Sequence, residues 1–369
     1  SIFNRRIEGS VEVYRNTTKD LLIRATIPSS TGYSTQFQNI GQTSNKGIEF
    51  SFTADVVRNK NLRLSASFNI GFNKYRIDKL GEAKNWIEDS GILASGGPMG
   101  DYYIEEGGSV GLMYGYELSG NGIYSFDDFT YDNGIYTLKP GVSDNQNLIG
   151  PSFFAPGVLK LVDQNGDNLV DNGDKTVIGN SNPKHFGGLN LTMQYKGFDM
   201  SMFFNWVYGN DVYNANKLRY TLSGQASTNA YGNIFNVMNS KDRFNYFDLE
   251  HPGVRVTDPI ALAELNKNAK YWSPVHNRAV LTSWHVEDGS FLRLNNLTLG
   301  YTLPKSLLSK IKITSLRVYV TGYNLWIWTN YTGYDPEVDS MRATPLTPGI
   351  DYNAYPRARS YNVGLNLTF

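Results

Sequence analysis

The stretch that decides the fold is Ser360-Tyr-Asn-Val-Gly-Leu-Asn-Leu-Thr-Phe369. Its large apolar residues recur at every second position, and they are Tyr361, Val363, Leu365, Leu367 and Phe369. Because successive side chains of a β-strand point to opposite faces, these residues share one face and the small or polar residues share the other. The stretch therefore predicts a strand that separates an apolar environment from a wet one.

The same alternation recurs in long segments elsewhere in the chain. It runs through Leu62–Asn73 and again through Phe198–Gly209, where the apolar residues are larger. A soluble antiparallel sheet with one wet face would also alternate. Three details favour a membrane barrel: segments of about 9 to 12 residues, aromatic residues near the ends of the apolar faces, and polar faces rich in Asn, Ser, Thr and Gly. The aromatic ending of Ser360–Phe369 resembles the terminal strand of bacterial outer-membrane proteins.

The composition excludes several functional classes. The 369 residues carry 34 Lys and Arg against 34 Asp and Glu, so the chain has no overall field for nucleic acid. The absence of Cys excludes a disulfide scaffold, thiolate metal sites and a cysteine nucleophile. No uncharged apolar run approaches the roughly 20 residues of a membrane-spanning helix. We therefore expect an all-β chain that crosses the membrane with strands.

Connection lengths predict the topology, because outer-membrane barrels have short periplasmic turns and long extracellular loops. With the C-terminus at the periplasmic side, about nine strands are consistent with this rule. They are 6–15, 20–28, 46–57, 62–74, 186–196, 198–209, 290–303, 314–324 and 360–369. The extracellular loops are then about 29–45, 75–185, 210–289 and 325–359. An extra hairpin within 75–185, where Val110–Leu118 alternates, would give about eleven strands.

An odd number of strands predicts an incomplete barrel. Single-chain bacterial outer-membrane barrels have an even number of strands, with both ends of the chain on the periplasmic side. An unpaired edge in lipid would leave backbone groups without hydrogen bonds. We therefore expect a second chain, or an N-terminal part of the same polypeptide, to close the barrel.

The strongest candidate ligand motif is an Asp-rich loop. Oxygen donors recur at positions 1, 3, 5, 9 and 12 of a twelve-residue run, with a backbone carbonyl available at position 7, as in calcium-binding loops. The donors are Asp163, Asn165, Asp167, Leu169, Asp171 and Asp174. Asn168 replaces the usual Gly at position 6, although Asn tolerates the left-handed conformation, and Asp replaces Glu at position 12. The motif predicts a calcium ion that stiffens an extracellular loop, and an ordinary polar turn is the alternative.

Other motifs give weaker indications. Gly107–Gly111 fits the G-x-S-x-G pattern, but a nucleophile elbow needs a following helix and the sequence there alternates like a strand. The four histidines show no metal-binding spacing, and they are His185, His251, His276 and His285. We therefore expect no enzyme. The aromatic residues of the 210–289 and 325–359 loops would either stack on sugars or a partner, or form a core of their own.

Several stretches resemble the SusC/RagA branch of TonB-dependent outer-membrane transporters. The best is Val286-Glu-Asp-Gly-Ser-Phe-Leu-Arg-Leu-Asn-Asn-Leu-Thr-Leu-Gly-Tyr-Thr-Leu-Pro304, which is similar to a strand-and-turn signature of that family. Leu316–Leu325, Tyr331–Glu337 and Tyr355–Pro356 follow it at the expected distances, and Ile7–Leu22 resembles a mid-barrel strand pair. The resemblance covers nearly the whole chain.

The resemblance implies the C-terminal part of a plugged barrel of about 22 strands. It also implies import of oligosaccharides or peptides across the bacterial outer membrane, with energy passed by TonB to a plug outside this chain. A SusD-like surface lipoprotein would sit on the extracellular loops. One alternative is a SusC-type barrel that serves as a structural subunit of an outer-membrane assembly or secretion complex. A weaker alternative is a soluble carbohydrate-binding β protein.

Overall fold

A computed structural model describes most of the chain. The described residues are 6–26, 32, 35–81, 84–93, 100–151, 153–221, 242–248, 250–251, 253–275, 278–308, 313–340 and 344–369. Within them, eight strands form one antiparallel sheet in the order β1-β2-β3-β12-β13-β16-β17-β19. Their bounds are β1 (Ile7–Thr26), β2 (Thr35–Arg58), β3 (Leu62–Lys79), β12 (His185–Tyr195), β13 (Phe198–Tyr208), β16 (Phe291–Thr302), β17 (Ser315–Thr329) and β19 (Ser360–Thr368).

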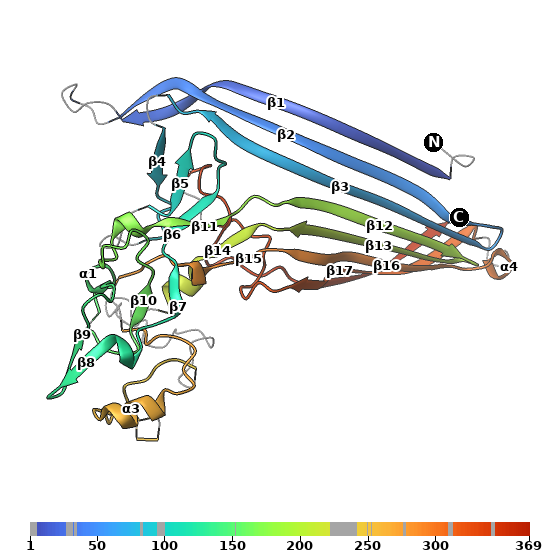
Figure 1. The fold of residues 1–369 in the computed structure, drawn as a ribbon. Helices are drawn as coiled ribbons and strands as arrows, with labels where there is room; N and C mark the ends of the chain where they lie inside the picture. The colour runs from blue at the N-terminus through green and yellow to red at the C-terminus, as the bar shows by residue number, and fades with distance from the viewer. Residues whose placement is uncertain are drawn as a thin grey trace.

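The sheet is an open part of a barrel. It curves along its width, and the start of β1 and the C-terminus lie near the same end of the strands (Figure 1). Its edge strands are β1 and β19, which do not pair with each other within the described residues. The prediction of an all-β partial barrel is therefore confirmed.

The outer face of this sheet is apolar and uncovered. Phe50 of β2 pairs with Ile70 of β3, and Gly187 of β12 pairs with both Ile70 and Trp206 of β13. These residues therefore form one row across four strands. At the edges, the side chains of Val13 and Val363 are 76% and 80% exposed. A continuous exposed apolar surface of this kind marks contact with lipid or a partner, and it follows directly from the alternating sequence.

One end of the sheet, the turn end, has only short connections. They are residues 59–61, Lys196–Gly197, and 303–314, which contains α4 (Lys305–Leu308). Lys196 and Gly197 both have positive φ, at 47° and 92°, as a two-residue hairpin turn of type I′ requires. A Cβ on Gly197 would lie 2.9 Å from the carbonyl oxygen of Thr302, so glycine also meets a steric need there. The connections at the other end, the loop end, are residues 27–34, 80–184, 209–290 and 330–359.

The predicted count of about nine strands is wrong by one. Segments 6–15 and 20–28 are not a hairpin but one strand, β1, whose pairing with β2 continues through Asn16↔Asn45 and Thr17↔Ser44. A bulge between Thr18 and Leu22, where Asp20 has φ 58°, replaces the expected turn. The alternative of about eleven strands is also wrong, because Val110–Leu118 contributes to small sheets outside the barrel sheet. The first strand therefore begins at the turn end, not the loop end, and the expected odd number of strands is wrong for the described sheet. The case for an incomplete barrel rests instead on the unpaired edges of β1 and β19.

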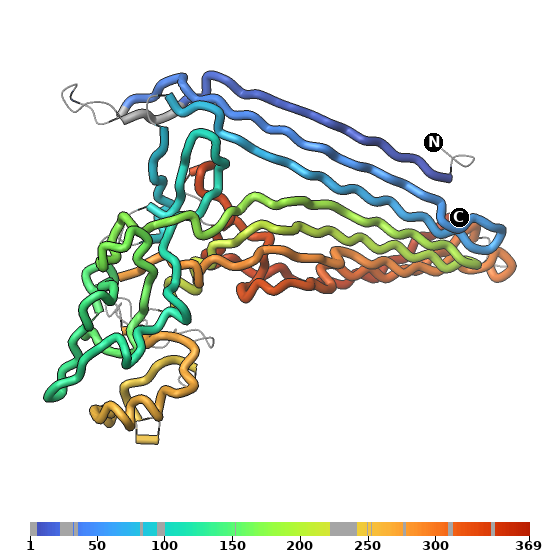
Figure 2. Tube along the Cα trace, in the orientation of Figure 1, coloured from blue at the N-terminus to red at the C-terminus, as the bar shows by residue number. Residues whose placement is uncertain are grey.

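The three longest connections fold together into a loop cap, defined as the described parts of 80–184, 209–290 and 330–359. Figure 2 shows these segments gathered at one end of the sheet. Its strands are β4 (Asn85–Glu88), β5 (Tyr102–Glu105), β6 (Leu112–Gly115), β7 (Leu118–Ile123), β8 (Phe129–Asp132), β9 (Ile135–Leu138), β10 (Leu159–Leu161), β11 (Thr176–Asn180), β14 (Asp211–Asn214), β15 (Val286–Asp288) and β18 (Ile350–Asp351). Its helices are α1 (Gln146–Ile149), α2 (Ala215–Tyr220) and α3 (Pro259–Leu265). Among the described residues, no helix has the length and apolar character needed to cross a membrane.

Candidate functional site: the polar inner face and the loop cap

The inner face of the sheet is polar and carries charged pairs. Arg317 of β17 reaches across β16 to Asp199 of β13 through two hydrogen bonds, with Nε to Oδ1 at 2.8 Å and Nη2 to Oδ2 at 2.5 Å. Gly300 lies beneath this pair, and a Cβ there would stand 2.5 Å from Arg317 Nη2 and 2.6 Å from Asp199 Oδ1. Glycine on β16 therefore lets a bidentate ion pair form on the inner face.

A pocket of about 370 Å³ opens nearer the loop end. Its inner-face side chains include Glu49, Asn69, Phe186, Phe203 and Asn205. Small residues make room for the rings, because a Cβ at position 71 would lie 3.2 Å from Phe186 and one at position 188 would lie 3.2 Å from Phe203. Aromatic faces beside carboxylate and amide groups suit solutes rich in hydroxyl or amide groups.

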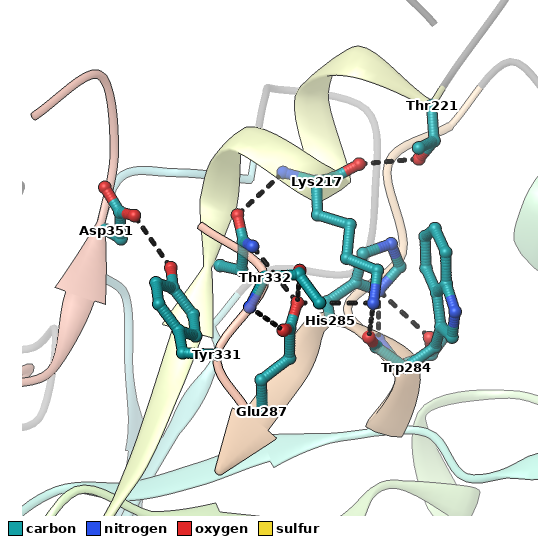
Figure 3. A network of polar contacts seen from close by, with 10 residues as sticks. Lys217, Thr221, Trp284, His285, Glu287, Tyr331, Thr332 and Asp351 are labelled. Atoms are coloured by element: carbon teal, nitrogen blue, oxygen red, sulfur yellow. Dashed lines mark hydrogen bonds and ion pairs between the residues drawn. The ribbon is translucent and has the colours of Figure 1, made fainter. Parts of the chain in front are cut away.

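A buried ion pair joins separate segments of the loop cap. Lys217 of α2 lies 3.3 Å from Glu287 of β15, and their side chains are 8% and 11% exposed. Lys217 Nζ also donates to the Trp284 carbonyl at 2.8 Å and lies 3.8 Å from the centre of the Trp284 ring. Glu287 accepts hydrogen bonds from Asn214 Nδ2 and from both the amide and the hydroxyl of Thr332. Figure 3 shows this network at the meeting point of the 209–290 and 330–359 segments.

A second carboxylate extends the network. Asp351 of β18 accepts hydrogen bonds from Tyr331 Oη at 2.7 Å and from Asn216 Nδ2 at 3.2 Å. Burial raises the pKa of Asp351, and the hydrogen bonds from Tyr331 and Asn216 oppose that shift. Burial lowers the pKa of Lys217, and the neighbouring Glu287 opposes that shift. Both shifts follow from the burial of these groups at the centre of the loop cap.

An arginine of the barrel wall holds the 330–359 segment, and a second arginine within that segment completes the charge cluster. Arg293, on the inner face of β16, donates through Nη2 to Asp335 Oδ1 at 2.6 Å, and both side chains are 5% exposed. Arg357 completes the cluster, with its Nη1 2.9 Å from Glu337 Oε2 and its Nε 3.4 Å from Asp335 Oδ2. Wall and cap are thus joined by charge as well as by packing.

The structure leaves the predicted metal ligands bonded to backbone amides. Asp163 accepts from Gly166 and Asn168, Asp167 accepts from Leu169, and Asp171 accepts from Gly173. Asn165 accepts from the Asp167 amide, and fully buried Asp174 accepts from Gln164, Asn165 and Asp171. Leu169 forms a bridge with Asp144. Asn168 has φ 67°, as expected for position 6. Across the described residues, no three carboxylates or imidazoles converge as a metal-binding group.

The other candidates have structural roles. Ser109 lies between the short strands β5 and β6, without the helix that a nucleophile elbow needs. His185 stacks on Tyr208 at 4.9 Å, His251 pairs with Asp248, and His285 is buried against Thr282. His276 lies outside the described residues.

Five of the described loop aromatics are buried in the cap, and a core was one of the two expected roles. Tyr213, Phe244, Tyr246, Trp272 and Tyr331 are at most 6% exposed. Phe247 and Tyr334 remain exposed, at 51% and 69%. Only such exposed rings are free to stack on a solute or a partner.

Sequence reasoning missed the residues that hold the cap together. Lys217 and Glu287 are 70 positions apart in the sequence, and Arg293 and Asp335 are 42 apart. No spacing rule links such distant residues. The one available signal was a charged residue, Arg293, within an alternating strand.

Comparisons with known proteins agree with this architecture. The family described as TonB dependent receptor-like, beta-barrel matches residues 2–90. The chain is 32% identical to TonB-dependent receptor P3 of Formosa agariphila, with 100% of this chain and 33% of that relative aligned. It is 30% identical to TonB-dependent receptor SusC of Bacteroides thetaiotaomicron, with 99% of this chain and 30% of that relative aligned. The chain thus spans about a third of the length of these relatives.

A solved structure shows the same fold. The RagAB peptide transporter superposes with a TM-score of 0.68 at 23% identity, over 100% of this chain and 34% of that one. The relatives are receptors and transporters, which confirms the expectation that the chain is not an enzyme. Over its whole length the chain is therefore similar to about a third of TonB-dependent receptors such as SusC, and its open sheet resembles part of their β-barrel.

Proposed function

We propose that the chain forms part of the wall, the inner lining and the mouth of a TonB-dependent importer of oligosaccharides or peptides. The observation that carries this proposal is a sheet with an apolar outer face and a polar inner face, covered at one end by a packed loop cap. A barrel of this design holds a hydrated path through lipid. Relatives named as TonB-dependent receptors and a fold shared with a peptide transporter support it.

The partners follow from the same proposal. Long connections gather at the loop end and short ones at the turn end, so the loop cap faces the outside and the C-terminus faces the periplasm. A SusD-like lipoprotein would rest on the cap, where Phe247 and Tyr334 are exposed. Further strands, from the same protein or a second chain, would pair with β1 and β19, and a plug would receive energy from TonB.

Uptake by the full-length receptor tests the proposal. A strain that lacks the receptor would be complemented with the wild-type gene and supplied in parallel with labelled oligosaccharides and labelled peptides. Uptake of one class should return, and dissipation of the inner-membrane proton gradient should abolish it. A receptor that reaches the outer membrane but restores neither uptake would refute import and favour the structural-subunit alternative.

We also propose that the Asp163–Asp174 loop binds Ca²⁺. Four carboxylates lie in this loop, and none of them forms an ion pair with a Lys or Arg of the described residues. Asp174 is fully buried, and a buried carboxylate without a counter-charge is costly. The left-handed Asn168 gives the sharp turn that a cation-wrapping loop needs.

Calorimetry with Ca²⁺ on the full-length receptor tests this second proposal. Asp163→Asn with Asp171→Asn should remove one binding event. The matched control, Asp127→Asn just before β8 with Asp132→Asn at the end of β8, should keep it. Equal Ca²⁺ stoichiometry in both variants, with the same protection of the loop from proteolysis after chelation, would refute calcium binding there.

A further inference from the structure

Three cations stand side by side on the first three strands. Arg15 of β1 is the direct cross-strand partner of Lys46 of β2, and Lys46 is the direct partner of Lys74 of β3. All three side chains are exposed. Directly opposed like charges destabilise an antiparallel pair. The arrangement, here named the basic row, is therefore unfavourable for folding unless an anion compensates for it.

The basic row lies on the outer face of the barrel wall. Because side chains alternate, Arg15 shares its face with Val13, Lys46 with Ile48, and Lys74 with Phe72. Those three apolar residues form the preceding cross-strand row, two positions closer to the turn end. The basic row is thus the first row beyond the apolar surface, about 7 Å farther along the strands.

In the part of the chain that the structure describes, no ion pair neutralises this row. Among the described residues, none of the three cations forms an ion pair. Glu12 and Glu49, which are three positions from Arg15 and Lys46, are cross-strand partners on the opposite, inner face.

A small pocket lies directly over the basic row. Its volume is about 190 Å³, and Arg15, Ser44, Lys46, Lys74, Arg76 and Asp78 line it. Asp78 accepts a hydrogen bond from Ser44 Oγ at 3.0 Å and lies 3.8 Å from Arg76. The one carboxylate of the pocket is thus already partnered, and the three cations of the row are left for a ligand.

We propose that the basic row binds the phosphate-bearing headgroup of an anionic membrane lipid at the loop-end surface of the bilayer. The apolar row beside the basic row favours a lipid over a free anion. The acyl chains of a bound lipid would lie on Val13, Ile48 and Phe72, next to its headgroup. Several cations within one row suit the multiple acceptor oxygens of a phosphate group. Each basic residue near an anionic headgroup strengthens binding by about fivefold.

Lipid retention by the full-length receptor tests the proposal. The receptor would be placed in nanodiscs of phosphatidylcholine with a minor fraction of phosphatidic acid, and native mass spectrometry would count the lipids it retains. Arg15→Gln with Lys46→Gln and Lys74→Gln should lower the preference for phosphatidic acid by about 100-fold. Lys46→Arg with Lys74→Arg should keep it. The matched control, Arg58→Gln with Lys60→Gln and Lys196→Gln, removes three charges at the turn end and should also keep it.

Thermal stability gives an independent readout. In phosphatidylcholine alone, the triple Gln variant should be at least as stable as the wild type, because it loses the like-charge repulsion. Phosphatidic acid should raise the melting temperature of the wild type and not that of the triple variant. Equal lipid retention by the two proteins would overturn the proposal. So would an equal loss in the turn-end control, or displacement of the lipid by millimolar inorganic phosphate.

Discussion

Replacement of Lys217 by Met should release the loop cap from its central anchor. Lys217 and Glu287 are both nearly buried, and the ammonium also contacts the Trp284 carbonyl and ring. Methionine keeps the aliphatic part of the side chain and removes the charge. Glu287 would remain buried, with its hydrogen bonds from Asn214 and Thr332 but without a cation.

The burial of the Lys217–Glu287 pair determines how much free energy Lys217→Met costs. Breaking a buried ion pair by removing one partner costs about 3 to 5 kcal/mol. Because Glu287 keeps three donors, we expect the lower value, about 3 kcal/mol in the free energy of opening the cap. That corresponds to roughly 150-fold faster hydrogen exchange, at 1.36 kcal/mol per factor of ten.

Hydrogen exchange of the full-length receptor measures the effect at named amides. The Thr332 amide, which donates to Glu287, and the Tyr213 amide, which donates to the Gly349 carbonyl, should both exchange faster. Amides of β13 should not change. Lys267→Met is the matched control, because its ion pair with Glu264 on α3 is exposed and should be worth little. Unchanged exchange at Thr332 in Lys217→Met, or no recovery in Lys217→Met with Glu287→Gln, would refute the reasoning.

Three further changes test other parts of the structure. Gly300→Ala should break the Arg317–Asp199 pair and lower barrel stability by about 1 kcal/mol, since the pair is partly exposed, as measured by heat-dependent gel mobility. Burial raises the pKa of Asp101 to about 6. The contribution of the protonated Asp101 side chain to the free energy of unfolding is therefore complete below pH 3.9, and it is lost as the pH rises through 6. Cap protection should therefore fall by up to about 3 kcal/mol between pH 4 and 7, and Asp101→Asn should flatten that dependence. Trp272→Ala, at a side chain 1% exposed, should cost the cap about 3 to 5 kcal/mol, detected as faster proteolysis.

The sequence predicted the barrel strands well where lipid imposes the pattern. Phe198–Tyr208 and Ser360–Thr368 have one apolar and one polar face in the structure as in the sequence. The outer face is consistently apolar because a polar side chain there would meet hydrocarbon, whereas the inner face also accepts rings such as Phe203. The alternation fails in β1 near Asn16, where the strand has passed beyond the apolar surface. Both faces are wet there, so polar residues indicate a turn although the backbone still pairs.

The cap could not be predicted in the same way. Its stability depends on contacts such as Lys217 with Glu287 and Arg293 with Asp335, which join segments far apart in sequence. Buried loops satisfy their polar groups through specific partners instead of a repeating pattern. Only local features of the loops were visible beforehand, such as the left-handed residue at Asn168.

The two edge strands of the sheet have backbone groups that need hydrogen-bond partners. Strands β1 and β19 each offer an unpaired backbone ladder on the side away from their neighbours in the described sheet, and their outward residues are exposed and apolar. Hydrocarbon supplies no hydrogen bonds, so each edge needs another strand. Direct pairing of β1 with β19 would close a barrel of eight strands, whose interior is just wide enough for side chains. The cap is anchored through Arg293 to the inner face of β16, and such a narrow barrel would leave no path beneath it. A wider barrel completed by further strands meets both needs.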